Sequence, residues 1–262
     1  QVQALQLYNS NGGFTSSQVQ ALSSAQIKAL TGAQFTAFEA ADMALLLADQ
    51  IKAIDASDVA SLTNAQLAGL STSQFRELTT AQIAGLTNAQ VSGLSTNYFA
   101  NMTTDQMRAL TTDHIKLLTT GAAGQLAAIG TAGLASLSTS QIAAMTTNQI
   151  AGLTTSTTTG QLVALTNTQI AALTTSQIAA LTTGATNGQI GALTSGQIAA
   201  LTTAQIRAFS AGTGGQIASI ASSDFQALTS SQLAALTTSQ IQALGTAASG
   251  QLSAMTTSQI QA

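Results

Sequence analysis

The sequence predicts an all-α solenoid built from very short capped helices. Three observations support this fold class. An eight-residue unit, Leu-Thr-Thr-x-Gln-Ile-x-Ala, fills nearly the whole chain, each unit carries the signals that start a helix, and the charged residues are sorted along each unit. Residues 165–181 show two consecutive units without interruption. We expect the units to group into layers of three or four, and the alternative fold is a β-solenoid.

Within each unit, Thr and Gln stand three residues apart, which is the spacing of a capping box. In this motif the Thr hydroxyl accepts a hydrogen bond from the Gln N–H, and the Gln side chain reaches back to the Thr N–H. The preceding Leu and the following Ile occupy the positions of a hydrophobic staple. Because an N-cap residue has non-helical backbone angles, a cap every eight residues predicts a new helix every eight residues. The clearest capping pairs are Thr166 with Gln169, Thr174 with Gln177, and Thr237 with Gln240.

Two other local structures fit the unit poorly. A continuous helix would rotate its apolar stripe by roughly 80° per unit, because eight residues make about 2.2 turns. An extended strand would send Leu and Ile to opposite faces, since they lie five residues apart, and the Gln-Ile-Ala-Ala core is not rich in strand-forming residues.

The charged residues also favour short helices. All six basic residues fall two positions after a Gln slot: Lys28, Lys52, Arg76, Arg108, Lys116 and Arg207. Of the nine acidic residues, all except Glu77 lie between the Thr cap and the Gln slot. Acids at the start and bases toward the end of each segment match the partial charges at helix termini.

Along the chain, we divide one continuous repeat array into three parts. Residues 1–17 form a partial repeat followed by a loop, residues 18–118 form uninterrupted octads that carry most of the charge, and residues 119–262 form a nearly neutral half. After residue 117 the only charged residues are Arg207 and Asp224. Residues 39–49 lack the Thr pair, so we expect a longer helix there.

Insertions of three or four residues interrupt the neutral half, and each ends in Gly directly before Gln. These glycines are Gly124, Gly160, Gly188, Gly215 and Gly250. The octad groups that they separate start 36, 28, 27 and 35 residues apart. Such a superperiod is the length of a repeating structural layer, so we expect loops stacked on one side of a solenoid.

The composition argues against several kinds of site. The net charge of −3 provides no basic stripe for nucleic acid, and no apolar run approaches the roughly 18 residues of a membrane span. The only imidazole, His114, stands in a Gln slot, where we expect it to cap a helix rather than to catalyse or bind metal. We therefore expect no enzyme, no cofactor and no metal site. The seven Phe residues fall in Leu or Ile slots and predict core positions, whereas Tyr98 falls in a polar slot and suggests a surface or interface role.

Three units in particular resemble a known type of repeat: residues 173–181, 201–209 and 236–244. They are similar to the repeats of large exported proteins of Gram-negative bacteria, which are often labelled adhesins or haem-utilisation proteins. The resemblance implies export and a shaft-like or surface role. It gives no support for haem binding here, since His114 and the five Met residues form no evident axial pair.

Together these patterns favour a structural function. We expect a self-associating extracellular or cell-surface repeat protein, either a filament subunit or an adhesin shaft. Both ends of the sequence stop inside a unit, so either the chain is a piece of a longer protein or copies of it dock end to end. The alternative is a surface-binding module, in which the second Thr of each pair contributes to an exposed array that recognises ice, a glycan or a host receptor.

Overall fold

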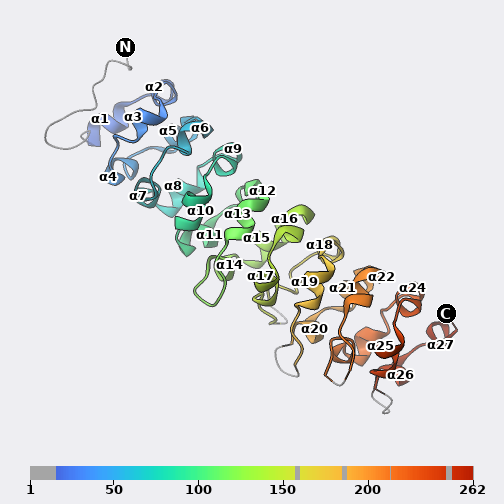
Figure 1. Ribbon diagram of the computed structural model, residues 1–262. Helices are drawn as coiled ribbons and strands as arrows, with labels where there is room; N and C mark the ends of the chain where they lie inside the picture. The colour runs from blue at the N-terminus through green and yellow to red at the C-terminus, as the bar shows by residue number, and fades with distance from the viewer. Residues whose placement is uncertain (1–15, 157–159, 185–187, 213, 246–249, 262) are drawn as a thin grey trace. The chain divides into compact units, whose positions relative to one another are not determined.

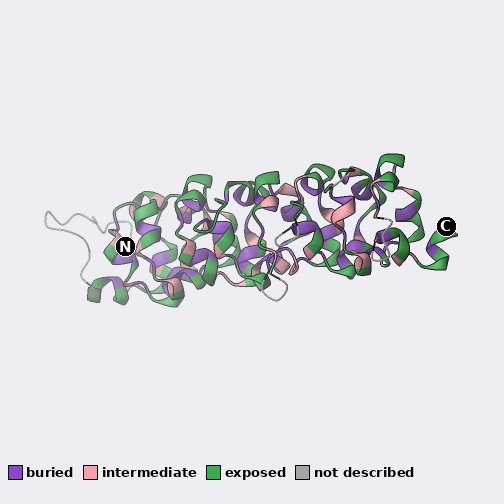
Figure 2. Ribbon diagram, turned by 90° about the horizontal axis from the view of Figure 1, so that it is seen from below, coloured by how far each residue is buried: buried purple, intermediate pink, exposed green. Residues whose placement is uncertain are grey.

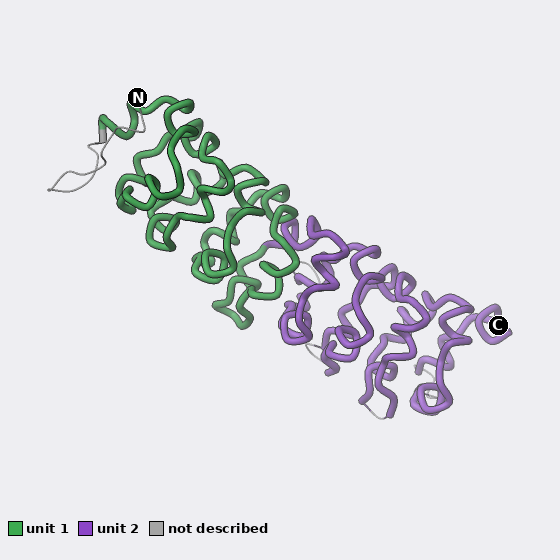
Figure 3. Tube along the Cα trace, turned by 45° about the horizontal axis from the view of Figure 1, so that its top comes forward, with its two compact units in different colours: residues 1–129 green, residues 130–262 purple. Residues whose placement is uncertain are grey.

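The computed structural model describes residues 16–156, 160–184, 188–212, 214–245 and 250–261. The chain divides into two compact units, residues 1–129 and 130–262, which Figure 3 colours separately. The division lies between Ile129 and Gly130, whereas the charge pattern places the boundary between residues 118 and 119. Of the partial repeat and loop expected at residues 1–17, only the last two residues lie within the described part.

Both units consist of short helices joined by tight turns (Figure 1). The helices of unit 1 are α1 (Ser16–Ala21), α2 (Ser24–Lys28), α3 (Gly32–Phe35), α4 (Ala40–Met43), α5 (Ala48–Ala53), α6 (Ala56–Val59), α7 (Asn64–Gly69), α8 (Thr72–Arg76), α9 (Thr80–Ala84), α10 (Asn88–Gly93), α11 (Thr96–Asn101), α12 (Thr104–Ala109), α13 (Thr112–Leu117) and α14 (Gln125–Ala128). Those of unit 2 are α15 (Thr131–Ser136), α16 (Thr139–Ala144), α17 (Thr147–Ala151), α18 (Asn167–Ala172), α19 (Thr175–Ala179), α20 (Gln189–Ala192), α21 (Ser195–Ala200), α22 (Thr203–Ala208), the 3₁₀ helix η2 (Ile217–Ser219), α23 (Ser222–Phe225), α24 (Ser230–Ala234), α25 (Thr238–Gln242), α26 (Gln251–Ala254) and α27 (Thr257–Ile260).

This arrangement confirms the all-α solenoid of very short helices. The residues at the junction of two octads explain why each helix stops. Between α18 and α19, Leu173 has φ −59° and ψ 136°, and Thr174 has φ −70° and ψ 158°. Two extended residues thus follow each run of about six helical residues, which restarts the helix with a period of eight. No strand occurs in the described residues, so the alternative of a β-solenoid is not supported.

The octads of unit 1 wind into turns whose helices are offset from those of the preceding turn. Helix α9 packs against α6, which lies three octads earlier. At the same time Gln82 of α9 donates hydrogen bonds to the carbonyls of Ile51 and Ile54, at the end of α5, four octads earlier. One turn therefore takes about three and a half octads, so each helix lies over the junction between two helices of the preceding turn.

Unit 2 has the same geometry although insertions interrupt its octads. Helix α19 packs against α17, three octads earlier. Gln177 of α19 reaches the carbonyls of Ile142 and Met145, which belong to the octad of α16, four octads earlier. Whole octads are therefore the unit of stacking, and an insertion lengthens a turn without changing which octads meet.

The insertions of unit 2 recur once per turn. Those that end in Gly160, Gly188, Gly215 and Gly250 are separated by three, three and four octads, which matches a turn of about three and a half octads. Gln189 directly follows Gly188 and bonds the carbonyl of Leu153, the last residue before the preceding insertion. Gln216 makes the equivalent bond to Leu181. The described residues that flank successive insertions are therefore bonded to one another in this unit.

Four of the five insertions interrupt a capping box without breaking it, and at the fifth Gly245 has no hydroxyl, so only its N–H bonds the Gln251 side chain. Thr154 and Gln161 are seven residues apart, yet the Gln161 N–H still donates to the Thr154 hydroxyl at 3.0 Å. The glycine before Gln is needed because the chain folds back tightly. A Cβ on Gly160 would clash with the carbonyl oxygen of Ser156. Gly124, in unit 1, has the same close approach to the carbonyl of Thr119.

The Ile and Leu slots form the core of each unit and the Gln slot is buried beside them, while the two Thr positions and the residue after them are mostly exposed (Figure 2). Burial of these two side chains per octad supplies the apolar contact that an isolated octad lacks. The Phe side chains of the described residues are buried in the same slots, as the pattern predicts: Phe35, Phe38, Phe75, Phe99, Phe209 and Phe225. Phe14 lies outside the described residues.

The longer helix expected at residues 39–49 is wrong. Two short helices, α4 and α5, occupy this region even though both lack a Thr cap. The Glu39 N–H donates to the Asp42 carboxylate at 2.8 Å, and the Leu47 N–H donates to the Gln50 side chain at 2.7 Å. The side chain in the Gln slot alone therefore satisfies the first backbone donor, so the octad period persists without the Thr hydroxyl.

Candidate functional site

Capping boxes join Thr and Gln within individual octads. In α19, the Thr174 N–H donates to Gln177 Oε1 at 2.8 Å, and the Gln177 N–H donates to Thr174 Oγ1 at 3.2 Å. The pair Thr166 and Gln169 of α18 forms the same two bonds, at 2.8 and 3.2 Å. The pair Thr237 and Gln240 of α25 forms them at 2.9 and 3.2 Å.

The same Gln side chain has a second role, which we call the glutamine bridge: its Nε2 group donates to two backbone carbonyls of the preceding turn. Gln177 Nε2 lies 2.9 Å from the carbonyl oxygen of Ile142 and 2.7 Å from that of Met145. These carbonyls stand at the end of a short helix, where the Ile142 carbonyl also accepts from the Met145 N–H at 3.1 Å. One amide therefore caps the start of its own helix and the end of a helix in the preceding turn.

Glutamine bridges occur within both units. The Gln residues whose bridging bonds are described are Gln50, Gln66, Gln74, Gln82, Gln90, Gln106 and Gln125 in unit 1, and Gln169, Gln177, Gln189, Gln197, Gln205, Gln216, Gln232, Gln240, Gln251 and Gln259 in unit 2. Most of these amides are nearly inaccessible to solvent. Among the described residues, no buried side-chain nitrogen or oxygen atom lacks a hydrogen bond.

The capping motif predicts the hydrogen bonds within an octad but not the bridge to the preceding turn. A capping box accepts Glu as readily as Gln, because only an acceptor is required. The sequence has only two Glu residues and neither is in a Gln slot, whereas Asp42, Asp58 and Asp224 do occupy this slot. The strong preference for Gln agrees with the need for a donor in the bridge, since a carboxylate can only accept.

Two other residue types replace Gln in the bridge. His114 accepts from the Thr111 N–H at Nδ1, 3.3 Å away, while its Nε2 lies 2.9 Å from the carbonyl oxygen of Leu86. Tyr98 hydroxyl reaches the carbonyls of Leu67 and Leu70 at 3.0 and 2.6 Å. Burial raises the pKa of the Tyr98 phenol, which keeps its donor proton in place.

The surface role expected for Tyr98 is therefore wrong. Its side chain is buried and packs against Phe75, with ring centroids 4.4 Å apart. The polar slot of the octad faces the preceding turn rather than solvent, so a polar residue type in this slot does not indicate exposure.

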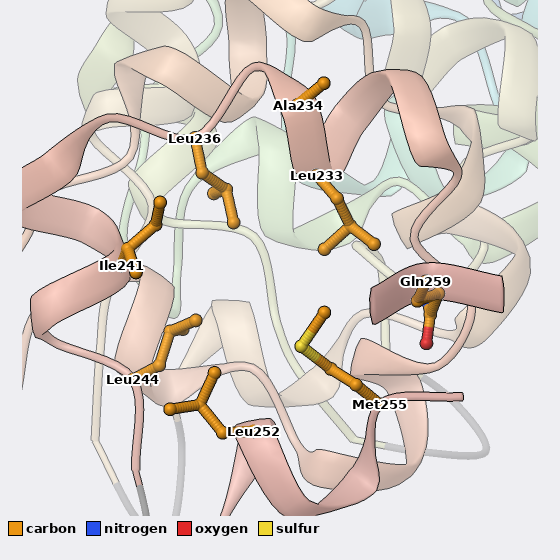
Figure 4. Close-up of a pocket in the computed structure, with 8 residues that line it drawn as sticks. All are labelled: Leu233, Ala234, Leu236, Ile241, Leu244, Leu252, Met255 and Gln259. Atoms are coloured by element: carbon orange, nitrogen blue, oxygen red, sulfur yellow. The ribbon is translucent and has the colours of Figure 1, made fainter. Parts of the chain in front are cut away.

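An apolar pocket lies in the last described turns of unit 2 (Figure 4). It has a volume of about 190 Å³. Figure 4 shows side chains from α24, α25 and α26 surrounding this space. The lining residues are Leu233, Ala234, Leu236, Ile241, Leu244, Leu252, Met255 and Gln259.

Apolar residues of these turns are exposed where the octad pattern places core residues. Ile241 is 50% exposed, Leu252 36% and Ile260 69%, whereas Ile178 in the same slot is fully buried. In earlier turns of unit 2 the Ile side chain is covered by later octads. The exposed residues and the pocket together form what we call the apolar end surface, defined by Leu236, Ile241, Leu252, Met255 and Ile260.

Charged groups are sparse, and in the described residues all except the buried Asp42 lie at exposed or partly exposed positions. Glu77, the one acid outside the charge pattern, pairs with Lys52 of the preceding turn at 2.7 Å. Within the described residues, no group of three or more His, Asp or Glu side chains is arranged to hold a metal ion. The helices in this part of the chain are also too short to cross a membrane.

One family matches the repeats found in this structure. The ALTTAQ repeat matches residues 51–88, 59–96, 123–155, 158–184 and 217–257, which together cover more than half of the chain. The chain belongs to the ALTTAQ repeat family. No curated protein and no solved structure matches it. The ALTTAQ repeat identifies a repeat protein, while the resemblance to exported Gram-negative adhesins stays a prediction.

Proposed function

We propose that this ALTTAQ repeat protein is structural and self-associating, as a filament subunit or an adhesin shaft, outside the cell or on its surface. The observation that carries the proposal is the apolar end surface. Contact with a second copy would remove Ile241, Leu252 and Ile260 from water, and each fully buried aliphatic side chain contributes about 1.5–3 kcal/mol.

The neutral half of the sequence supports contacts along the sides as well. Between residues 117 and 262 only Arg207 and Asp224 are charged, so copies can meet there with few charges to desolvate. We propose no catalytic activity, because the only imidazole of the chain, His114, is engaged in a bridge on both ring nitrogens. The resemblance to exported repeat proteins supports the extracellular location.

Polymer formation by the purified full chain tests the proposal. The variant Ile241→Lys places a charge in the apolar end surface, and it should fold because this side chain is half exposed. Leu47→Lys is the matched control, since Leu47 is 52% exposed and lies in unit 1, far in sequence from the pocket.

We expect sedimentation velocity and electron micrographs to show polymers for the parent chain and for Leu47→Lys, and shorter polymers or monomers for Ile241→Lys. A parent chain that stays monomeric up to high concentration would refute self-association. Unchanged polymer length in Ile241→Lys would refute the role of the apolar end surface.

The second candidate, a surface-binding module, rests on the exposed second Thr of the octads. Thr175, Thr203 and Thr238 are all exposed, and the capping bonds of their octads use the first Thr instead. Such hydroxyls are free to meet ice, a glycan or a host receptor. A monomeric chain whose Thr-bearing octads gain hydrogen-exchange protection on adding one of these ligands would favour this function over self-association.

A further inference from the structure

His114 is the only imidazole in the sequence, and it occupies a position where all of its hydrogen bonds require one protonation state. The Leu86 carbonyl can only accept, so Nε2, 2.9 Å away, must carry a hydrogen. The Thr111 N–H can only donate, so Nδ1, 3.3 Å away, must be free of hydrogen. The neutral ring with its hydrogen on Nε2 is the one form that satisfies both partners.

Protonation of this ring opposes both the hydrogen bonds and the burial. A hydrogen on Nδ1 would face the Thr111 N–H, leaving two donors and no acceptor at the start of α13. The side chain is only 3% exposed, so the new charge would be poorly hydrated. Burial accordingly lowers the pKa of His114 from its ordinary value, although the Leu86 carbonyl and Asp113 act in the opposite direction.

The charged groups near the ring do not remove this conflict. Asp113 is on the same helix, but its carboxylate is 68% exposed and pairs with Lys116 at 3.0 Å. Helix α10, against which α13 packs, contains no ionisable side chain, and neither does the segment around Leu86 that receives the Nε2 bond. No neighbouring acid from the preceding turn is therefore in place to hold an imidazolium.

We propose that His114 makes one octad of unit 1 an acid-sensitive switch, in which protonation uncaps α13 and releases it from the preceding turn. The Gln residues in the equivalent slots do not titrate, so the rest of the array keeps its bridges in acid. The response is therefore local: α13 and the insertion that begins at Thr119 loosen, while the octads that carry Gln stay closed.

The direction of the pH dependence follows from the lowered pKa. A His whose pKa is lower in the folded state contributes stability that is fully present above the ordinary His pKa of about 6.5. This contribution is lost as the pH falls through the pKa of the folded state. The loosening should therefore appear in mild acid and reverse on return to neutral pH.

Two measurements on the full chain test the switch. The ring signals of the single His, followed by NMR between about pH 7.5 and pH 4.5, report the protonation of His114 directly. Hydrogen exchange followed by mass spectrometry, corrected for the intrinsic pH effect on exchange, reports the opening of α13. We expect exchange in α13 to rise by up to about tenfold per pH unit as the pH falls from the ordinary His pKa of about 6.5 to the lowered pKa of folded His114, and to level off below that pKa.

Two variants test the switch with residue types that already occur in the Gln slot of this sequence. His114→Gln restores the common bridge and should remove the acid response of α13, whereas Gln82→His should create a new acid response in α9. Exchange in α13 that does not change across the titration would overturn the proposal. So would an equal acid response in His114→Gln.

Discussion

Replacing Gln177 with Glu isolates the bridge from the cap. Glu keeps an oxygen that can accept from the Thr174 N–H, so the capping bond at 2.8 Å survives. It loses the amide donor 2.9 and 2.7 Å from the carbonyls of Ile142 and Met145. The Ile142 carbonyl keeps its bond from the Met145 N–H, so the lost bond matters most at the Met145 carbonyl. A buried acceptor that loses its donor costs about 1–3 kcal/mol, and we expect the stability of α19 and its contact with α16 to fall by at least this amount at neutral pH.

The loss of stability in Gln177→Glu should become smaller as the pH falls. The new carboxylate would be buried against two carbonyl oxygens, which raises its pKa because the ionised form is disfavoured. Once protonated, the group can donate to one of the two carbonyls. The difference between Gln177→Glu and the parent chain should therefore shrink as the pH falls.

Hydrogen exchange is the appropriate assay, because repeat arrays open in segments and a single unfolding midpoint averages over them. Ser176→Glu is the control, since it adds the same charge one residue earlier at an exposed position in the first turn of α19. We expect this control to change stability by less than about 0.5 kcal/mol. Equal exchange in the two variants would refute the claim that the bridge holds successive turns together.

Three further substitutions test other contacts. Thr174→Val removes the cap acceptor while keeping the shape, and should lower the stability of α19 by about 1 kcal/mol in urea unfolding; an equal loss in the exposed control Thr175→Val would contradict this. Tyr98→Phe removes the donor to two buried carbonyls and should cost about 1–3 kcal/mol, which Tyr98→Gln should recover if the bridge is responsible. Gly69→Ala forces a methyl group against a backbone carbonyl of the preceding turn, whereas the methyl group of Gly93→Ala meets a flexible side chain. We therefore expect Gly69→Ala to lower the thermal midpoint more than Gly93→Ala, and the reverse order would contradict the packing argument.

The local part of this structure is predictable from sequence because it depends on spacing alone. Thr174 and Gln177 are three residues apart, so their hydrogen bonds form within one octad whatever surrounds it. The buried Ile and Leu slots follow for the same reason. Residue type is a poorer guide than spacing at residues 39–49, because Asp42 and Gln50 cap the starts of their helices although no Thr precedes them.

The contacts between turns are not predictable from a single octad. The partner of Gln177 is Ile142, 35 residues earlier, and this distance depends on how many octads make a turn. The five insertions are separated by four, three, three and four octads, and the mean of three and a half already contains that value. Tyr98 is expected at the surface only because a polar slot looks exposed until the preceding turn is known to cover it.

Every glutamine bridge described in the two units points backward along the chain. The amide comes from the later octad and the carbonyls come from the earlier one, as when Gln240 donates to Ile206, 34 residues before it. During synthesis from the N-terminus, the acceptors for each new glutamine have therefore already been synthesised when that glutamine emerges. If synthesis began at the C-terminus, each Gln amide would emerge before the carbonyls to which it donates. The array thus has an intrinsic order of assembly, in which each new octad closes on octads already synthesised.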